Sequence, residues 1–531
     1  MKYSAINIGP IIGTLSMARK PRELWTASFL FSYLMKCIYA EAEQAKAVII
    51  SPAKPEKETG RVGIYPDRLF IRGEFNVRDI LKSAINQFLN AIGLKQNEFD
   101  NYFNIMTATC DVAKDSLAIY ELNQKLDVLE LCNYAADKDA TKAIYKIIAP
   151  YKKTENLLYR KATGTKFEVK TLAEYATAEL EGLNSQMWEE ARRQARLEEK
   201  IIDKLADELK LIDKELPEDL LYNWDDFYSK LNKCFVEECK DNISENKKQS
   251  LIRSYHKYFC VVQADGDNVG KTVSHEGLNQ DDVLNISKEL ASFGTKSATL
   301  IEEFGGLPIY AGGDDLLFIS PVIGKDRSNI FDLLDKIEKD AFKGVHDVVG
   351  TLGIKDDDGK LIEASLSFGV SISYYKYPLY EALEAARTLL FNVAKNKERF
   401  PDKKAVAWSL RKHSGGTFDA AFSLKDEKLK EQFKTLITAT TDNDTVSAIA
   451  HKLRQEEALV DVVLASRNQD RLDALFDKVL EFDKDKADYF NAVKTIMPTL
   501  YEVVGKDGYI QTLYSLLRTA KFIKGEDLHD E

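Results

Sequence analysis

Hydrophobic and polar residues alternate without a break along residues 363–375, "EASLSFGVSISYY". Apolar side chains occupy the even positions, and serine or glycine occupies the odd positions from 365 to 373. A period of two is typical of a β-strand with one apolar face. Because serine and glycine are small, we expect the other face to leave room for a bulky planar ligand or a sugar.

The stretch around this strand predicts an ordered series of strands and helices. The elements in chain order are a strand from 255 to about 265, a helix over 283–301, a hairpin at 308–320, a helix near 328–342, the strand at 363–375, a helix at 379–397 and a strand at 405–410. The order strand, helix, strand, strand, helix, strand is that of a ferredoxin-like split βαβ unit. The sequence therefore predicts a mixed α+β domain here.

The remaining chain is mostly helical in pattern. The N-terminal part predicts a strand at 3–8 that ends at Gly9-Pro10, a helix over 23–44, a loop rich in proline, glycine and charge at 51–67, a strand at 68–73 and a long helix from 77. Charged helix formers dominate 170–253, which predicts an exposed helical connector. From 415 to the end the pattern predicts helices only.

Composition restricts the class of protein. The 531 residues are 44% hydrophobic and 30% charged, which is typical of a soluble globular protein with several domains. No apolar run approaches the roughly 18 residues that a membrane span needs, and no signal peptide is recognisable, so we expect a cytoplasmic protein. The six scattered cysteines fit a reducing compartment and predict no zinc site. The net charge of −11 argues against a free-standing nucleic-acid binder.

The candidate chemistry lies where two predicted strands meet. Asp265 and Asp267 follow the first strand, and Asp314 and Asp315 form part of the hairpin tip "AGGDD". In a split βαβ sheet these strands are neighbours, so the carboxylates converge. Two unit charges 4 Å apart repel by about 4 kcal/mol at an effective dielectric near 20. Binding of hard cations relieves that repulsion, and a ligand set made of oxygens alone favours Mg²⁺ or Mn²⁺.

The glycines of the same tip favour a phosphate ligand. Gly312 and Gly313 carry no side chains, so backbone N–H groups can approach an anion. Lys395 follows a predicted helix within reach of a triphosphate. These parts together predict two-metal nucleotidyl transfer. The alternative interpretation is an ordinary polar hairpin tip. "GDNVGKT" at 266–272 is one residue too short for a P-loop and is not one.

Several segments resemble a known family. "ADGDNVGK", "AGGDD", "ASLSFGVSISYYKYPLYEALEAARTLLFNVAK" and "VAWSLRKHSGGT" resemble the catalytic palm of the large subunit of type III CRISPR effector complexes, the Cas10 family. The N-terminal "INIGPIIGTLSMARKPRELWTASFLFSYL" resembles the first palm of the Cmr2 type found in subtype III-B complexes. The Gly-Gly-Asp-Asp motif alone is shared with nucleotide cyclases and GGDEF-type signalling enzymes.

The resemblance implies a fold with two ferredoxin-like palm domains of the cyclase and polymerase type. It places a degenerate first palm with a helical insertion at 1–165, a helical connector at 166–253, a catalytic palm at 254–414 and a helical C-terminal domain at 415–531. The first palm has Gly9-Pro10 where the second has Asp-Gly-Asp, so it offers no metal ligand and is expected to complete a composite nucleotide pocket. Arg19, Lys20 and Arg22 are expected to contact RNA or another subunit.

The resemblance also implies an activity. The enzyme would work inside a ribonucleoprotein complex with other subunits, a guide RNA and a target RNA, and pairing with target RNA would activate it. It would convert ATP into a second messenger, either a cyclic oligoadenylate or AMP joined to S-adenosylmethionine. By the match of motifs, the two Mg²⁺ or Mn²⁺ ions and the nucleotide would be held by two sets of residues. The metal ligands would be Asp265, Asp314 and Asp315, and the nucleotide contacts Gly266, Asn268, Gly312, Gly313, Ser367 and Lys395.

The sequence departs from the family in two respects, and two other functions stay open. The ligands of an HD nuclease site are absent, so we expect no DNA cleavage, and the cysteine pairs of a zinc site between the palms are missing. The first alternative is a catalytically silent scaffold that binds nucleotide in the same complex. The second is a stand-alone GGDEF-like cyclase, which would use GTP, although the Glu-Phe typical of those enzymes is absent here.

Overall fold

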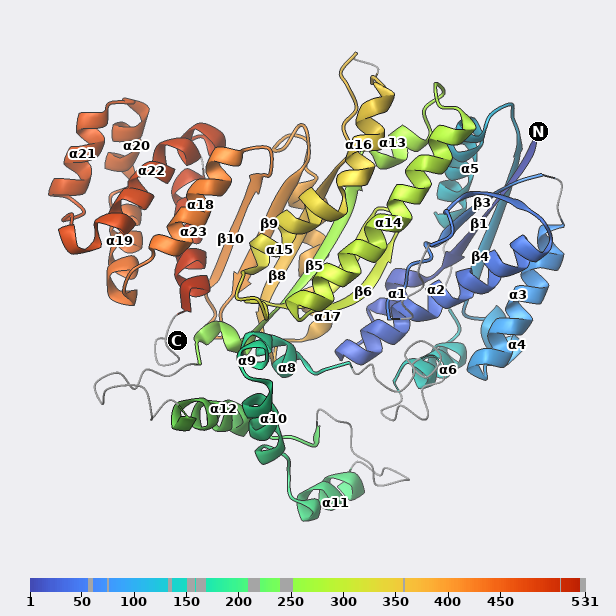
Figure 1. Cartoon of the computed structure of the whole chain (residues 1–531), viewed down its shortest axis with the longest axis horizontal. Helices are drawn as coiled ribbons and strands as arrows, with labels where there is room; N and C mark the ends of the chain where they lie inside the picture. Colours follow the sequence, from blue (N-terminus) through green and yellow to red (C-terminus); the bar gives the residue numbers. More distant parts are fainter. Residues whose placement is uncertain are drawn as a thin grey trace.

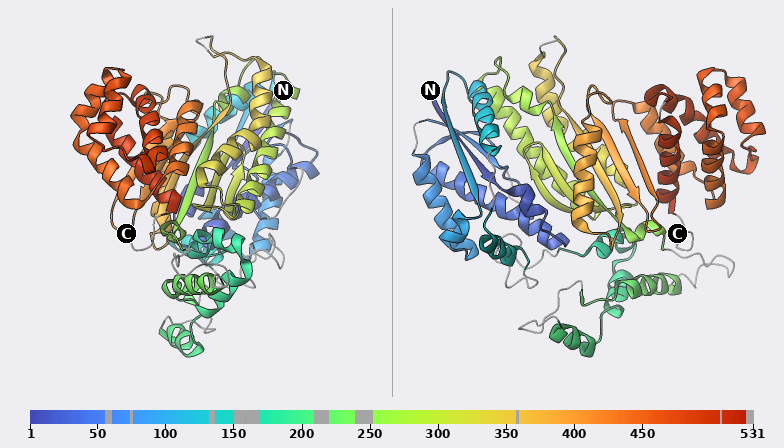
Figure 2. Two further views of the ribbon diagram at one scale, coloured as in Figure 1. Left: turned by 60° about the vertical axis from the view of Figure 1, so that its left-hand side comes forward. Right: turned by 180° about the vertical axis from the view of Figure 1, so that it is seen from behind.

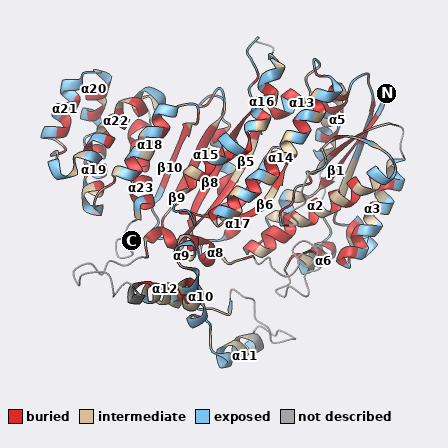
Figure 3. Cartoon of the chain, in the orientation of Figure 1, coloured by how far each residue is buried: buried red, intermediate tan, exposed pale blue. Residues whose placement is uncertain are grey.

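The computed structural model has two β-sheets beside each other, with helices at one end and below (Figure 1). The N-terminal sheet and the C-terminal helices lie at opposite ends of the molecule, with the larger sheet between them. Strands and the inner sides of their helices are buried (Figure 3). The structure describes residues 1–55, 61–73, 76–131, 136–149, 158, 169–208, 220–238, 252–356, 359–506 and 508–525.

The first sheet has the strand order β2-β3-β1-β4, and all of its pairs are antiparallel. Its strands are β1 (Lys2–Gly9), β2 (Val48–Ser51), β3 (Arg68–Arg72) and β4 (Asn104–Asp111). The helices around it are α1 (Ile11–Leu15), α2 (Pro21–Gln44), α3 (Val77–Ile92), α4 (Gln96–Asp100), α5 (Asp115–Glu130) and α6 (Lys138–Ile148). Ile6 and Ile8 share a core with α2 and α3, whereas Tyr3 and Ala5 share one with α5. This is the predicted ferredoxin-like sheet, with a helix on each face.

The second sheet has the strand order β10-β9-β8-β5-β7-β6. Its strands are β5 (Tyr258–Asp267), β6 (Leu307–Gly312), β7 (Asp315–Pro321), β8 (Ser365–Tyr374), β9 (Ala405–Arg411) and β10 (Thr417–Ser423). The four strands β8-β5-β7-β6 repeat the order of the first sheet. β9 is parallel to β8, and the other pairs are antiparallel. The α+β prediction with two ferredoxin-like sheets is therefore confirmed.

Helices cover both faces of the second sheet. The helical segments that follow its strands are η3 (Ser254–Lys257), α13 (Val269–Val273), α14 (Gln280–Phe304), α15 (Ile330–Lys336), η4 (Ile337–Ala341), α16 (Lys343–Leu352), α17 (Leu379–Thr388) and η5 (Leu389–Ala394). Apolar side chains of β5, β7 and β8 share one core with α14, α15 and α16. Helix α17 packs on the opposite face, against β5 and β8.

The prediction that the serine face of β8 leaves room for a ligand is wrong. Ser367, Ser371 and Ser373 are fully buried. Helix α17 and the helical turn η5 lie directly on this face, because Gly369 has no side chain. A Cβ atom at Gly369 would lie 2.1 Å from the carbonyl oxygen of Ala386. The small residues of β8 therefore admit a helix, and not a nucleotide.

The prediction of helix from 415 onward is wrong for residues 417–423, which form β10. This strand pairs antiparallel to β9 after a turn in which Gly415 has a φ of +92°. Phe418, Ala420 and Phe422 are buried, so an alternation of period two is present there. Helices follow as predicted, namely α18 (Glu427–Ala439), α19 (Asn443–Gln455), α20 (Glu457–Ala465), α21 (Gln469–Lys478), η6 (Lys484–Lys486), α22 (Ala487–Val504) and α23 (Tyr509–Gly525). The four domain limits themselves stay predictions.

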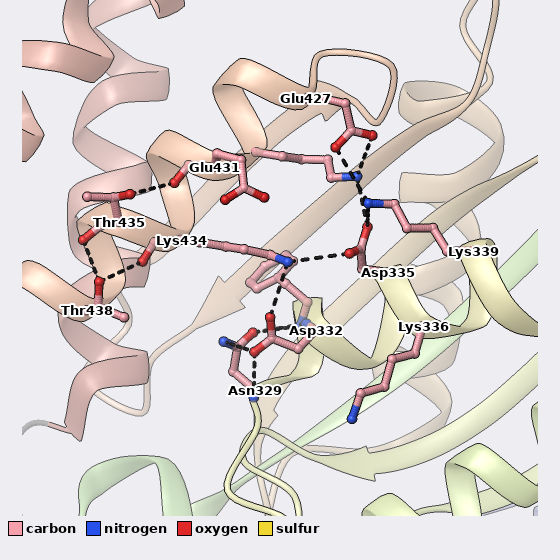
Figure 4. Close-up of polar contacts among 12 residues, drawn as sticks. Asn329, Asp332, Asp335, Lys336, Lys339, Glu427, Glu431, Lys434, Thr435 and Thr438 are labelled. Atoms are coloured by element: carbon pink, nitrogen blue, oxygen red, sulfur yellow. Dashed lines mark hydrogen bonds and ion pairs between the residues drawn. The ribbon is translucent and has the colours of Figure 1, made fainter.

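An ion-pair network joins the C-terminal helices to the second sheet (Figure 4). Lys430 Nζ on α18 lies 2.8 Å from Asp335 Oδ1 on α15, and Lys434 Nζ lies 3.4 Å from the other oxygen of Asp335. Lys434 also lies 3.6 Å from Asp332. Lys430 is 6% exposed. Charges that are paired this close to the core fix α18 against the palm.

The middle helices project from the lower side of the second sheet in each of three views (Figures 1 and 2). They are α8 (Leu172–Ala176), α9 (Ala178–Leu183), α10 (Ser185–Gln194), α11 (Glu199–Glu208) and α12 (Trp224–Glu238). Trp188, Phe227 and Leu231 form their own small core. Among the described helices, none combines the length and apolar character that crossing a membrane requires.

Candidate active site

The hairpin between β6 and β7 has a two-residue turn, Gly313–Asp314, because Gly312 pairs with Asp315. Gly313 has a φ of +64°. Glycine at the first turn position is what a type II′ hairpin requires, and such turns match the twist of the strands. Gly312 is constrained by packing, since a Cβ atom there would lie 2.7 Å from the hydroxyl oxygen of Tyr310. The two glycines thus form a tight tip that presents the aspartates.

The end of β5 lies against this tip. The amide N of Gly266 donates a hydrogen bond to the carbonyl oxygen of Asp314 at 3.1 Å. A Cβ atom on Gly266 would lie 2.6 Å from both Cβ and Oδ2 of Asp314. The β5–β7 register, in which Ala264 faces Leu316, continues to place Asp265 beside Asp315. The predicted meeting of the Asp265 segment with the Asp314–Asp315 corner is confirmed.

The carboxyl groups at this corner lie close enough to repel one another, and the pKa values of two of them are raised. Burial, followed by the negative charge of Asp265, raises the pKa of Asp314 to about 7. Burial and the charges of Asp265 and Asp314 also raise the pKa of Asp315 well above its usual range. The Asp315 side chain is nevertheless exposed to solvent, and it lines a cavity between the two sheets. A site of this kind favours a positive counter-charge.

Lys395 supplies a counter-charge from the end of η5. Its ammonium group contacts Asp265 Oδ2, donates to the carbonyl oxygen of Gly266 at 2.9 Å and lies 3.3 Å from Asp267 Oδ1. Burial lowers the pKa of Lys395, but the charges of Asp265 and Asp267 outweigh this effect and raise it overall. Lys395 is therefore charged and lies within the carboxylate cluster, whereas the sequence predicted that it reaches a triphosphate, and that role stays a prediction.

Asp267 holds the neighbouring strands together. It is fully buried, and its Oδ2 accepts hydrogen bonds from Ser365 Oγ at 3.0 Å, Ser367 Oγ at 2.8 Å and the amide N of Lys404 at 3.0 Å. The predicted contact between Ser367 and a nucleotide is wrong, because this hydroxyl is buried and donates to Asp267. Ser367 was predicted to contact a nucleotide because the alternating pattern of β8 shows that this face carries small side chains, but the pattern does not show which element covers the face.

The other predicted nucleotide contacts lie around the tip. Gly266, Gly312 and Gly313 are adjacent to Asp314, as described above. Asn268 has a left-handed backbone with a φ of +63° and begins α13. Its Nδ2 donates to the carbonyl oxygen of Glu363 at 3.0 Å. Asn268 thus anchors the loop ahead of β8, and its role toward a nucleotide stays a prediction.

The donor set fits hard cations in chemistry, since it contains only carboxylate oxygens. Within the described residues, no three His, Cys, Asp or Glu side chains are arranged as a metal site. The positive charge beside Asp265 is supplied by the Lys395 ammonium group. The assignment of Asp265, Asp314 and Asp315 as metal ligands is therefore a proposal that rests on their convergence and their chemistry.

A cavity of about 620 Å³ opens beside the tip, between the two sheets. A volume of this size is typical of small-molecule sites. The first sheet and its helices contribute polar residues to its wall, and the second sheet contributes others. They include Asn7, Asp67 and Glu130 from the first part and Gln263, Asp315 and Arg387 from the second. The pocket is composite, as the sequence predicted.

Sequence reasoning missed two residues near this site. Asp67 stands directly ahead of β3, as Asp314 stands directly ahead of β7, and the two strands begin "DRLFI" and "DDLLFI". That repeated pattern could have revealed it. Lys403 was missed as well. Burial and the positive charge of Lys395 lower the pKa of Lys403 overall, although the negative charges of Asp267 and Asp265 act in the opposite direction.

Comparisons with known proteins agree with this geometry. Residues 258–406 match the family model for the second palm domain of Cas10/Cmr2, and residues 3–64 match the N-terminal model of the CRISPR-associated protein Cmr2. The chain is 32% identical over 232 residues to the CRISPR system Cmr subunit Cmr2 of Pyrococcus furiosus. That match covers 38% of this chain and 24% of the relative, so the chain spans about a quarter of the relative's length.

Solved structures share the fold across nearly the whole chain. A type III-B Cmr-beta complex bound to cognate target RNA contains a chain with a TM-score of 0.51 and 10% identity, covering 95% of this chain and 83% of that chain. The apo state of Cmr-beta gives a TM-score of 0.52 with 11% identity, covering 95% and 82%. The second sheet with its Gly-Gly-Asp-Asp tip is thus a palm domain of the Cas10/Cmr2 type, and the segment that opens the first sheet matches the N-terminal region of Cmr2.

Proposed function

We propose that the chain is the nucleotidyltransferase subunit of a type III CRISPR ribonucleoprotein complex. It would act with other subunits, a guide RNA and a target RNA, and would polymerise or transfer adenylate from ATP to make a second messenger. The observation that carries this proposal is the convergence of Asp265 with the Asp314–Asp315 corner, beside a glycine turn and a composite cavity. The match to the Cas10/Cmr2 family models supports the choice of complex.

Each part of the site has a proposed task. Asp265, Asp314 and Asp315 would hold two Mg²⁺ or Mn²⁺ ions, which supply charge stabilisation and activate an attacking hydroxyl when bound. Gly312 and Gly313 would let backbone amides approach the phosphates. Lys395 would move from its carboxylate partners toward the triphosphate as cations enter. The cavity would orient the two reacting nucleotides and exclude water.

Lys403 is proposed as a second cation for the triphosphate. It lies on the loop after η5, close enough to Lys395 for the two charges to interact, and burial strips it of part of its hydration. A half-buried ammonium group beside a second positive charge favours an anionic ligand. The triphosphate of bound ATP is the anion that the proposed reaction provides there.

Replacement of Lys403 by alanine is expected to raise the KM for ATP about tenfold, since one charge-assisted hydrogen bond contributes roughly 1.5–3 kcal/mol. The value of kcat is expected to change little. Steady-state kinetics of the assembled complex measure both. Lys397→Ala is the matched control, because Lys397 lies on the same loop and is exposed. A KM equal to that of the wild type would remove Lys403 from the site.

Mass spectrometry of small products tests the function itself. The assembled complex would be incubated with ATP and Mg²⁺ or Mn²⁺, with and without target RNA and with and without S-adenosylmethionine. We expect a product and pyrophosphate only when target RNA is present. Cyclic oligoadenylates would identify polymerisation, and an AMP conjugate would identify transfer to S-adenosylmethionine. Absence of any product under all conditions would contradict the proposal.

One observation favours the second candidate, a scaffold that binds nucleotide without turnover. Lys395 contacts Asp265, and no metal-binding arrangement of acidic side chains is present among the described residues. The same product assay distinguishes the two functions, because a scaffold binds ATP but releases no pyrophosphate.

A further inference from the structure

The two palms pair their central strands in the same way, which reveals equivalent positions. In the first palm the amide N of Ile8 donates to the carbonyl oxygen of Asp67 at 3.1 Å. In the second palm the amide N of Gly266 donates to the carbonyl oxygen of Asp314 at 3.1 Å. Asp67 therefore occupies the place of Asp314, and Asn7, the residue before Ile8, occupies the place of Asp265. The degenerate palm keeps two polar side chains at its own version of the site.

Asn7 has an acceptor atom with no partner. It is 2% exposed and lines the cavity between the palms. Its Nδ2 donates to Glu130 Oε1, which orients the amide and turns Oδ1 the other way. Oδ1 is buried and makes no hydrogen bond in the part of the chain that the structure describes. A buried acceptor without a donor is costly, so a donor from a ligand is the natural complement.

Arg68 decides what kind of ligand fits. Its guanidinium donates to Asn123 Oδ1, Asp127 Oδ1 and Glu130 Oε1, each at 2.7 Å. The charge of Glu130 is therefore already compensated, and Arg68 places a positive charge beside this half of the cavity. A second divalent-cation site is disfavoured by that charge. A neutral hydrogen-bond donor, such as a hydroxyl or an amino group, suits a neutral amide oxygen and one carboxylate.

Asp67 faces the catalytic half of the cavity. It lines the same cavity as Asp315. The segment ahead of it is fixed to β6, because the amide N of Ala311 donates to the carbonyl oxygen of Gly63 at 2.9 Å. The distance between Asp67 and the hairpin tip is thus set by backbone bonds that join the two palms.

We propose that Asn7 and Asp67 form a pair of hydrogen-bond acceptors that positions a nucleotide in the cavity by accepting from its amino or hydroxyl group. The inference rests on the proposed function, since it assigns the first palm a task in recognising the substrate. ATP has three such groups, the exocyclic amino group of adenine and the ribose 2′- and 3′-hydroxyls, and we assign the pair to the amino group or the 2′-hydroxyl. Both residues are positioning residues, because the reacting phosphate is held by the second palm.

Calorimetric titration of the full chain with non-hydrolysable ATP tests the pair without relying on turnover. The probes are the parent analogue, its 2′-deoxy form and its purine form without the amino group. We expect wild type to bind one of the two modified probes at least about tenfold more weakly than the parent, the loss expected for one unpaired group. In Asp67→Ala and in Asn7→Leu, each of which removes one acceptor, the parent probe is expected to bind at least about tenfold more weakly, and the penalty for that modified probe is expected to disappear.

Controls separate this idea from simpler effects. Asp127→Asn removes an exposed carboxylate that also contacts Arg68 but does not line the cavity, and it should behave as wild type. Thermal unfolding identifies a variant that fails to fold, and Asp67→Ala, at a half-buried position, still tests the pair if the buried Asn7→Leu variant fails to fold. Variants that bind like wild type, or that keep the full penalty for the modified probe, overturn the pair. Loss of the proposed function would appear elsewhere, as a wild-type complex that makes no product from ATP.

Discussion

Asp314→Ala combined with Asp315→Ala is expected to lower product formation from ATP by roughly a thousandfold or more, which corresponds to about 4 kcal/mol of transition-state stabilisation. Both carboxylates lie at the hairpin tip beside Asp265, so their loss removes most of the negative charge available to hold divalent ions. The measurement is the rate of pyrophosphate release by the assembled complex with target RNA, confirmed by mass spectrometry of the product.

The same variant should fold at least as well as wild type. The pKa of Asp314 is raised to about 7 by burial and by Asp265, so the free energy of unfolding of the metal-free protein falls as the pH rises from about 4 to 7, and the full loss is present above pH 7. Removal of the two acids relieves the repulsion, and the midpoint of thermal unfolding without metal is expected to stay equal or rise at pH 8. Glu456→Ala with Glu457→Ala, an exposed acidic pair on the C-terminal helices, is the matched control. A double variant that makes product at the wild-type rate would place the chemistry elsewhere.

Gly369→Val is expected to destabilise the second palm by about 3 kcal/mol, at the upper end of overpacking effects. A Cβ atom there would lie 2.1 Å from the carbonyl oxygen of Ala386 and 2.5 Å from the amide N of Leu390. Both atoms are backbone, so no side-chain rotation relieves the clash, and α17 must separate from β8. The unfolding midpoint should fall by roughly 10 °C, since a domain of this size shifts by about 3 °C per kcal/mol.

Gly350→Ala is the control for this substitution. Gly350 lies in α16 with no atom near its missing side chain, and its backbone is not left-handed. Alanine in a helix interior stabilises a protein by about 0.5–1 kcal/mol relative to glycine, so the unfolding midpoint of this variant should be slightly higher than that of the wild type. A Gly369→Val protein with an unchanged midpoint would show that α17 does not press on β8 in solution.

Local pattern was sufficient for the catalytic half of the site. The apolar run of β5, the period of two at β8, the glycines at 312 and 313 and the order of strands and helices are all properties of short segments. A split βαβ topology then permits one arrangement in which the end of β5 meets the hairpin, so Asp265 and Asp314 were predicted to meet. Strand β10 was missed because its short pattern, "TFDAAFS", follows a glycine turn and precedes a long helical stretch.

Contacts between distant segments decided the rest. The chain's own residues determined the second palm sheet and its carboxylate corner, because these follow from periodicity, turn chemistry and strand order, while the first palm was expected from the family resemblance. Only the tertiary structure showed that α17 fills the serine face of β8, that Ser367 bonds Asp267, and that Asn7 and Asp67 enter the cavity from the first palm. Those facts depend on which faces pack together. The sequence of a strand shows whether the side chains on one face are small or polar, but it does not show which element covers that face.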